Sequence, residues 1–157
     1  MLYTIISSPL GDITAAIDND ALTELHIAGD RYFTKVPANW QRADHVLFEQ
    51  LSVQLEEYFA GKRTSFDLPI DFNGTEFQRL VWQKLQAISQ GETTTYARVA
   101  EEIGKPKAVR AVGTAIGKNP LCIVVPCHRV LASNGSLGGY VAGLDRKQQL
   151  LTLEGAM

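Results

Sequence analysis

The stretch TYARVAEEIGKPKAVRAVGTAIG, residues 95–117, decides the fold of the second half of the chain. Its first part repeats apolar or small residues at the spacing of one helical face: Tyr96, Val99, Ala100 and Ile103. Gly104 then ends this helix, and Pro106 can open the next one in its first turn, where a missing N–H costs nothing. Two short helices joined by a tight turn predict a helix-turn-helix.

The second predicted helix has two unlike faces. Its apolar face consists of Val109, Val112 and Ile116. The opposite face consists of Lys107, Arg110, Thr114 and Gly117, and small residues keep the helix slim at Ala108, Ala111, Gly113 and Ala115. A helix that reads bases in the major groove presents several Asn, Gln, Arg or Ser side chains, so this helix better suits recognition of a nucleic-acid backbone and its shape. An ordinary pair of helices with a solvated basic face is the alternative.

Positive charge is concentrated around this motif. Residues 1–74 hold five Lys and Arg against eleven Asp and Glu, a net charge of −6, whereas residues 75–157 hold ten against six, a net charge of +4. Residues 103–144 include no acidic side chain, and their basic residues are Lys105, Lys107, Arg110, Lys118 and Arg129. Such a segment favours a polyanionic partner.

The first half predicts a small α/β layer. Three β-prone runs at residues 2–7, 13–17 and 22–27 are separated by turn-forming residues and predict an antiparallel meander. We expect Asp44 to cap a helix that Gly61 ends, with apolar residues at Leu47, Leu51, Leu55, Tyr58 and Phe59. One helix that covers one sheet completes the layer.

A turn-rich segment at residues 62–74 predicts a boundary between two domains, which we place at 1–70 and 75–157. Beyond it, Thr75 and Gln78 form a capping-box pattern before a helix with apolar residues at Phe77, Leu80, Val81, Leu85 and Ile88. The 157 residues, 45% hydrophobic and 20% charged, suffice for one large core or two small ones. Neither a membrane-spanning run nor a secretory signal is recognisable, so we expect a cytoplasmic protein.

Four residues least expected in a buried strand interrupt the apolar run IVVPCHRVL: Pro126, Cys127, His128 and Arg129. A thiolate nucleophile needs a proton acceptor and positive charge nearby, and His128 and Arg129 follow Cys127 directly. Adjacent residues on an extended strand point to opposite faces, so contact between Cys127 and His128 requires a bend at Pro126 or a bridging water. An inert buried thiol is the alternative for Cys127, and it is our interpretation of Cys122.

The sequence offers no pattern for a metal or cofactor site. Both cysteines are expected to be reduced, because their spacing makes a poor disulfide framework. There is no Cys-x₂-Cys and no pair of histidines at helical spacing, and we expect His26 and His45 at the surface or half-buried. Residues 135–139, GSLGG, lack the Lys-Ser/Thr of a phosphate-binding loop and predict a flexible turn or lid.

The run PCHRV at residues 126–130, preceded by GKNP at 117–120 and by the helix-turn-helix with Tyr96 and Arg110, resembles the O6-alkylguanine-DNA alkyltransferase family. The Asn eight residues before the Cys and a Leu-Glu-Gly near the end keep the family spacing. The resemblance covers the chain from Thr75 to Gly155 and, more weakly, the first half. It implies an α/β (α+β) fold in which a ribonuclease H-like domain, a small antiparallel sheet with a helix, precedes a helical domain with the helix-turn-helix.

The resemblance implies DNA repair by direct reversal. An alkyl group, such as methyl, on guanine O6 moves irreversibly to Cys127, with O4-alkylthymine as a second candidate substrate. A thiolate attacks saturated carbon well and the thioether product is a poor leaving group, so the protein acts once. The implied partner is double-stranded DNA with O6-alkylguanine, bound by a monomer without a cofactor, a metal or a membrane.

The same resemblance assigns roles to other residues. His128 acts as a base through a bound water, Glu154 orients this relay, and Asn119 braces the turn that holds the nucleophile. Tyr96 assists the leaving guanine and helps to rotate the nucleotide, while Arg110 fills the vacated stack. Further implied DNA contacts are Thr95, Lys107, Ala108 and Ser133. The implied lining of the base pocket is Tyr96, Ile116, Val130, Tyr140 and Val141.

The chain departs from the family pattern at two points. Tyr140 is followed by Val141-Ala142-Gly143, where members commonly have smaller residues, which predicts an altered fit for alkyl groups. The chain also lacks the cysteines of the zinc site that some members carry in the first domain. Two other functions compete: an alkyltransferase-like protein that binds lesions without transfer, against which Cys127 counts, and a thiol hydrolase, which would turn over repeatedly.

Overall fold

The computed structural model describes residues 1–157, and its first half contains the predicted meander. Strands β1 (Leu2–Ile6), β2 (Ile13–Asp18) and β3 (Ala21–Ile27) pair antiparallel in chain order. Asn19 and Asp20 join β2 to β3 with φ angles of 49° and 59°, the conformation of a two-residue hairpin turn that follows the strand twist. A short strand that we did not predict, β4 (Gln41–Arg42), runs parallel to β1 and gives the order β3-β2-β1-β4.

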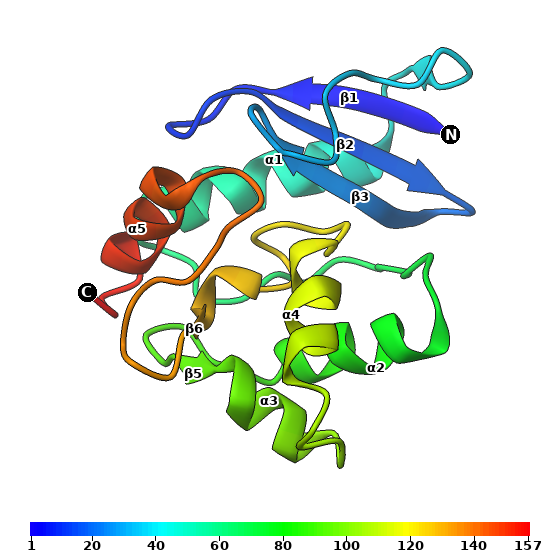
Figure 1. The fold of residues 1–157 in the computed structure, drawn as a ribbon. Coiled ribbons are helices and arrows are strands. Elements are labelled where there is room, and N and C mark those ends of the chain that lie inside the picture. Colours follow the sequence, from blue (N-terminus) through cyan, green and yellow to red (C-terminus); the bar gives the residue numbers. More distant parts are fainter.

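Helix α1 (Val46–Phe59) packs against this sheet (Figure 1). Its N-cap is His45 and not Asp44, because the extended His45 backbone places ring Nδ1 where it accepts from the Leu47 amide at 3.0 Å. The prediction of Asp44 was wrong by one residue, since an imidazole nitrogen here replaces the usual cap oxygen. The helix ends before Gly61, as predicted. With 14 residues α1 is the longest helix, and no helix has the length and apolar character needed to cross a membrane.

Helix α2 (Glu76–Leu85) begins with the predicted capping box. The Gln78 amide donates to the Thr75 hydroxyl at 3.1 Å, and the Thr75 amide donates to the Gln78 side chain at 3.0 Å. The predicted apolar face is partly wrong: Leu80 is 39% exposed, and Ile88 lies beyond the helix end. Trp82 is buried instead, and its Nε1 donates to a main-chain carbonyl at 2.8 Å, so the indole contributes both apolar area and a hydrogen bond.

Helices α3 (Tyr96–Glu102) and α4 (Val109–Gly117) pack together as the predicted helix-turn-helix. We predicted Pro106 in the first turn of α4, and this prediction was wrong. The Ala108 amide bonds to the Lys105 carbonyl at 2.9 Å, so the turn uses these residues and the helix begins after them. Val109 was wrongly placed on the buried face, because it is 37% exposed. The buried residues of α4 are Val112, Ala115 and Ile116.

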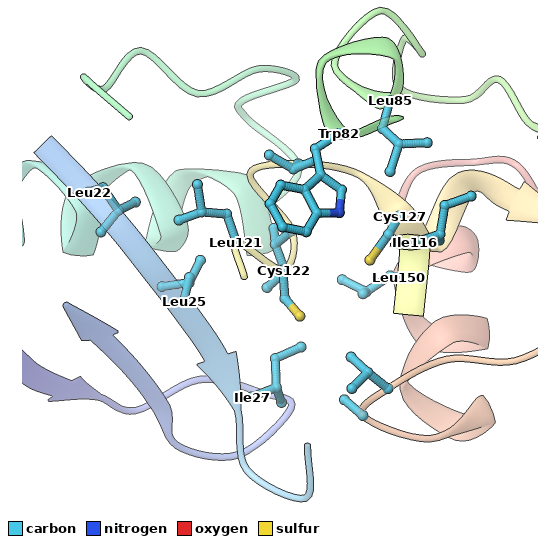
Figure 2. Close-up of a cluster of buried hydrophobic side chains, with 14 of the residues drawn as sticks. Leu22, Leu25, Ile27, Trp82, Leu85, Ile116, Leu121, Cys122, Cys127 and Leu150 are labelled. Carbon is cyan, nitrogen blue, oxygen red and sulfur yellow. The ribbon is translucent and has the colours of Figure 1, made fainter. Parts of the chain in front are cut away.

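The two halves of the chain share one core. A single cluster of 31 buried residues includes side chains of the sheet, of α1, α2 and α4, and of the segment around both cysteines (Figure 2). Strand β3 supports that segment, since the Leu25 amide donates to the Pro120 carbonyl at 2.7 Å and the Cys122 amide donates to the Leu25 carbonyl at 3.1 Å. Helix α5 (Leu144–Leu153) ends the chain beside α1 (Figure 1). The sheet of the first half therefore holds the segment that carries Cys127.

Candidate active site

Cys127 begins a short 3₁₀ turn, η1 (Cys127–Arg129), and does not lie in an extended strand. The chain bends at Pro126 (φ −81°, ψ 63°). Such a bend was one of the two arrangements that we named for bringing Cys127 and His128 together. Strand β6 (Val130–Leu131) follows and pairs with β5 (Thr94–Thr95) next to α3. Cys127, His128 and Arg129 are all buried. The turn thus keeps three polar residues together in the interior, where an extended strand would send alternate ones to opposite faces.

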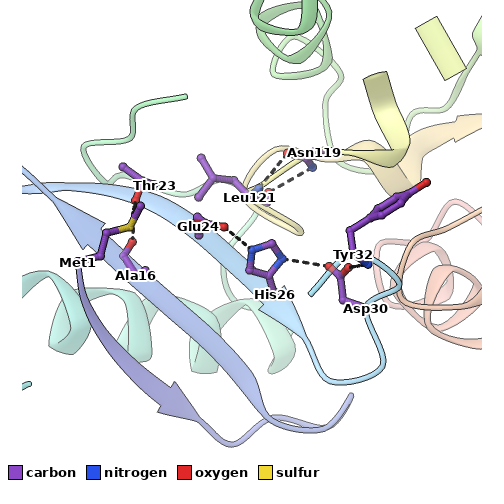
Figure 3. A network of polar contacts seen from close by, with 9 residues as sticks. All are labelled: Met1, Ala16, Thr23, Glu24, His26, Asp30, Tyr32, Asn119 and Leu121. Carbon is purple, nitrogen blue, oxygen red and sulfur yellow. Dashed lines mark hydrogen bonds and ion pairs between the residues drawn. The ribbon is translucent and has the colours of Figure 1, made fainter. Parts of the chain in front are cut away.

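Asn119 braces the loop that leads to Cys127. Its side-chain amide donates to the Val125 carbonyl at 2.9 Å. Its Oδ1 accepts from the Leu121 amide at 3.0 Å (Figure 3). Ile123, between these anchors, has a φ of 72°, a conformation that β-branched residues rarely adopt. The bonds to Asn119 hold the loop in this strained shape, and the geometry agrees with the role that the resemblance implies.

The carboxylate of Glu154 collects four hydrogen bonds in the interior. Oε2 accepts from His128 Nε2 at 2.7 Å, from Arg129 Nη2 at 2.9 Å and from the Tyr58 hydroxyl at 2.5 Å. Oε1 accepts from Arg129 Nε at 2.8 Å. Three protein side chains therefore satisfy this buried carboxylate without water. Burial acts to raise the pKa of Glu154, but the bonds from His128 and Arg129 outweigh it and hold the pKa at about 2.

His128 is neutral and presents Nδ1 as a proton acceptor. Burial lowers the pKa of His128 below its usual value of 6.5, and the hydrogen bond to Glu154 offsets this only in part. Because the ionised Glu154 can only accept, the imidazole carries its proton on Nε2. Nδ1 then has a free lone pair, and it is buried without a protein partner. A buried ring nitrogen with a free lone pair, in the same short turn as Cys127, can serve as a general base.

Cys127 forms a thiolate more readily than an ordinary cysteine. The neighbouring Cys122 thiol is the largest cause of its lowered pKa, the Asn119 side chain and the charge of Lys147 add to it, and burial opposes it. The pKa of Cys122 is raised well above its usual value, first by its interaction with Cys127 and then by burial. Both cysteines are free, as expected (Figure 2). The electrostatics therefore favour Cys127 as the nucleophile and Cys122 as its neutral neighbour.

Lys147, which we did not single out from the sequence, fixes the loop over the site. Its Nζ is buried and donates to the carbonyls of Val130 at 2.6 Å, Gly139 at 2.9 Å and Leu137. It also lies 5.9 Å from the ring centroid of Tyr96. Burial lowers the pKa of Lys147 to about 8. A lysine on a helix usually indicates a solvated face, so no sequence pattern pointed to this role. The segment that we predicted as a flexible turn or lid, residues 135–139, is held in place by Lys147.

A pocket of about 690 Å³ opens over Cys127. Four of the five implied lining residues border it: Tyr96, Ile116, Tyr140 and Val141. Val130, the fifth, is buried in β6 and is not among the residues that border the pocket. Helix α4 supplies another wall with Val109, Arg110, Gly113, Thr114 and Gly117. Gly139, Arg31 and Tyr32 complete the lining, and we missed Arg31 and Tyr32 because they lie in a loop of the first half.

The implied DNA contacts occupy three kinds of position. Two line the pocket with Cys127: Tyr96 and Arg110. Two are N-cap residues, of α3 and α4 respectively: Thr95 and Ala108. Two are exposed and lie outside the pocket: Lys107 and Ser133. The fold therefore places the implied flipping residues next to the cysteine and the other contacts around them.

We expected His26 at the surface or half-buried, but the structure buries it. It is 8% exposed, and its two ring nitrogens contact Asp30 at 3.1 Å and Glu24 at 2.8 Å (Figure 3). The two carboxylates thus lie on opposite sides of the ring and do not converge on one point. His45 is half-buried, as expected. No group of three or more His, Cys, Asp and Glu side chains is arranged to hold a metal ion.

The fold and the site together define a helix-turn-helix protein with an activated cysteine in a pocket beside that motif. Residues 76–156 match the family model described as the DNA binding domain of 6-O-methylguanine DNA methyltransferase, and residues 1–72 match its ribonuclease-like domain. The chain therefore belongs to the 6-O-methylguanine DNA methyltransferase family.

Individual relatives cover nearly the whole chain. A methylated-DNA–protein-cysteine methyltransferase of Methanosarcina acetivorans is 47% identical over 99% of both chains. One from Mycolicibacterium paratuberculosis is also 47% identical, over 97% of this chain and 91% of the relative. The crystal structure of Mycobacterium tuberculosis OGT in complex with DNA superposes with a TM-score of 0.91, at 42% identity, over 99% of this chain and 94% of that chain. The α/β fold implied by the sequence is thereby confirmed.

Proposed function

We propose that Cys127 is the residue that receives the alkyl group. As a methylated-DNA–protein-cysteine methyltransferase, this protein repairs DNA by transferring an alkyl group from the DNA to one of its own cysteines. The chain has two cysteines, and only Cys127 borders the pocket. The lowered pKa of Cys127 and the raised pKa of Cys122 support the same choice.

The buried contacts support a proton relay for this reaction. The Cys127 thiol loses its proton through a bound water to Nδ1 of His128, whose Nε2–H is held by Glu154 at 2.7 Å. The thiolate sulfur forms a bond to the alkyl carbon, and the bond between that carbon and guanine O6 breaks. The electron pair leaves with the guanine, and the proton taken up by His128 returns through water to the guanine ring, to which Tyr96 donates a hydrogen bond. The thioether stays on the protein, so each molecule reacts once.

The geometry of α4 supports extrusion of the damaged nucleotide. The alkyl carbon is hidden inside the duplex, so the guanine must leave the stack before Cys127 can reach it. The small residues of α4 permit close approach to the DNA backbone in the minor groove. Arg110 is exposed at the pocket and has no ion-pair partner, which leaves its guanidinium available to occupy the vacated stack.

The observation that carries this proposal is the position of Cys127 at the pocket, directly before His128, whose Nδ1 has no protein partner. Incubation with duplex DNA that contains O6-methylguanine should raise the intact mass of the protein by one methyl group, located on Cys127 by peptide mapping. Cys127→Ala should bind the same duplex and gain no mass, whereas Cys122→Ala should still be methylated. Transfer that persists in Cys127→Ala contradicts the assignment, and transfer to many equivalents of substrate indicates hydrolysis.

We further propose that the protein acts as a cytoplasmic monomer in which the chemistry belongs to residues 75–157 and residues 1–70 support it. The contacts of Tyr58 with Glu154 and of β3 with the cysteine loop support this division of labour. The bulkier Val141 after Tyr140 lines the pocket and alters the fit of alkyl groups there.

A further inference from the structure

Two residues of the first half border the pocket that contains Cys127. Arg31 and Tyr32 follow β3, and all other lining residues come from the second half of the chain. Tyr32 is 58% exposed, an unusual position for an aromatic side chain that is not packed in the core. The site thus has a wall that the helix-turn-helix does not supply.

A buried polar cluster fixes the loop that carries these two residues. Asp30 accepts from the Tyr32 amide at 2.8 Å with one oxygen and contacts His26 at 3.1 Å with the other (Figure 3). The His26 ring stacks on Phe33 with a centroid distance of 4.1 Å and an interplanar angle of 3°. The Arg31 amide donates to the carbonyl of the pocket residue Val141 at 2.9 Å. The loop is therefore held against the pocket in a defined position before any ligand arrives.

The charge at this wall suits an anion. Arg31 is exposed and has neither an ion-pair partner nor a side-chain hydrogen bond, although it lies in the half of the chain with a net charge of −6. Arg110 borders the same pocket and is also unpaired. None of the 13 lining residues is acidic. Two free guanidinium groups at one pocket without a carboxylate favour phosphate, which guanidinium binds in a bidentate manner.

We propose that Arg31 and Tyr32 form a substrate-binding wall contributed by the first half of the chain. Arg31 binds a backbone phosphate of the strand that carries the flipped nucleotide. Tyr32 packs its ring against the extruded base and its alkyl group, opposite the wall made by α4. This inference rests on the proposed function and extends it, because residues 1–70 then recognise the substrate directly.

Two substrates distinguish phosphate binding by Arg31 from base packing by Tyr32. Duplex DNA with O6-methylguanine has both a base and phosphates, whereas O6-benzylguanine as a free base has no phosphate. Arg31→Ala should weaken binding to O6-methylguanine duplex DNA and reduce the slope of log K against log salt by about 0.9, the value for one phosphate contact. Benzyl transfer from the free base should be slowed much less in this variant than repair of the duplex. Tyr32→Ala should slow transfer from both substrates roughly tenfold, the scale of one base–aromatic stack, and Tyr32→Phe should restore it.

Lys35→Ala is the matched control, because Lys35 is exposed in the same segment and does not line the pocket. The inference is overturned if the Arg31 and Tyr32 variants behave like Lys35→Ala with both substrates. It is equally overturned for Arg31 if Arg31→Ala slows the free base as much as the duplex. The parent protein and Cys127→Ala, assayed in parallel, show whether transfer to Cys127 occurs at all, so failure of the proposed function is recognised separately.

Discussion

Removal of one hydroxyl group tests the arrangement around Glu154. Tyr58 lies in α1 and donates to Glu154 Oε2 at 2.5 Å, across a sequence separation of 96 residues. A buried hydrogen bond to a charged group contributes about 1.5–3 kcal/mol. Tyr58→Phe keeps the ring in place and deletes only this bond, so the free energy of unfolding should fall by that amount. In a domain of this size the loss corresponds to a decrease of roughly 3–12 °C in Tm.

Thermal and urea unfolding of the two proteins measure this effect, and Tyr140→Phe supplies the control. The Tyr140 hydroxyl is also buried but makes no hydrogen bond to a nitrogen or oxygen atom, and only the weakly accepting Cys122 thiol is near it, so its removal should lower stability much less. In Tyr58→Phe, Glu154 keeps its bonds from His128 and Arg129, and methyl transfer should persist. Equal stability of Tyr58→Phe and the parent, or an equal loss in Tyr140→Phe, would refute the argument.

Three further outcomes follow from the same geometry. The pKa of Glu154 is about 2 in the folded protein, whereas its ordinary value is 4.5, so the unfolded chain binds the proton more tightly. The contribution of Glu154 to the free energy of unfolding should be full above pH 4.5 and decrease as the pH drops toward 2. Acid titration followed by circular dichroism measures this decrease. Gly138→Ala should destabilise the protein by about 1–2 kcal/mol or more, because Gly138 has a φ of 71° and a new Cβ would lie 2.9 Å from the Tyr96 hydroxyl; unchanged urea unfolding would contradict this. Arg110→Ala should slow repair of duplex DNA much more than transfer from free O6-benzylguanine, whereas Lys107→Ala should weaken duplex binding only; equal slowing of both substrates by Arg110→Ala would indicate a structural role instead.

Local patterns determined much of the fold. The capping box of Thr75 and Gln78 and the helical spacing of residues 96–103 involve neighbours in sequence, so the sequence predicted the start of α2 and the helix-turn-helix. The wrong predictions for Asp44 and Pro106 concern helix starts, and each was displaced by only a few residues. Several neighbouring residues could begin each helix, and the backbone conformation decides which of them does. The run PCHRV, with its family spacing, led to the correct family.

The complete site depended on tertiary structure. Tyr58 reaches Glu154, Arg31 reaches the pocket over Cys127, and Lys147 enters the interior instead of facing solvent. None of these positions has a local signature, because each depends on how the sheet, α1 and α5 pack around the cysteine loop. The sequence by itself determined which chemistry the chain contains, since residue types and their spacing are local properties. Packing alone decided which distant side chains hold that chemistry in place, because such contacts arise only when separate elements share one core.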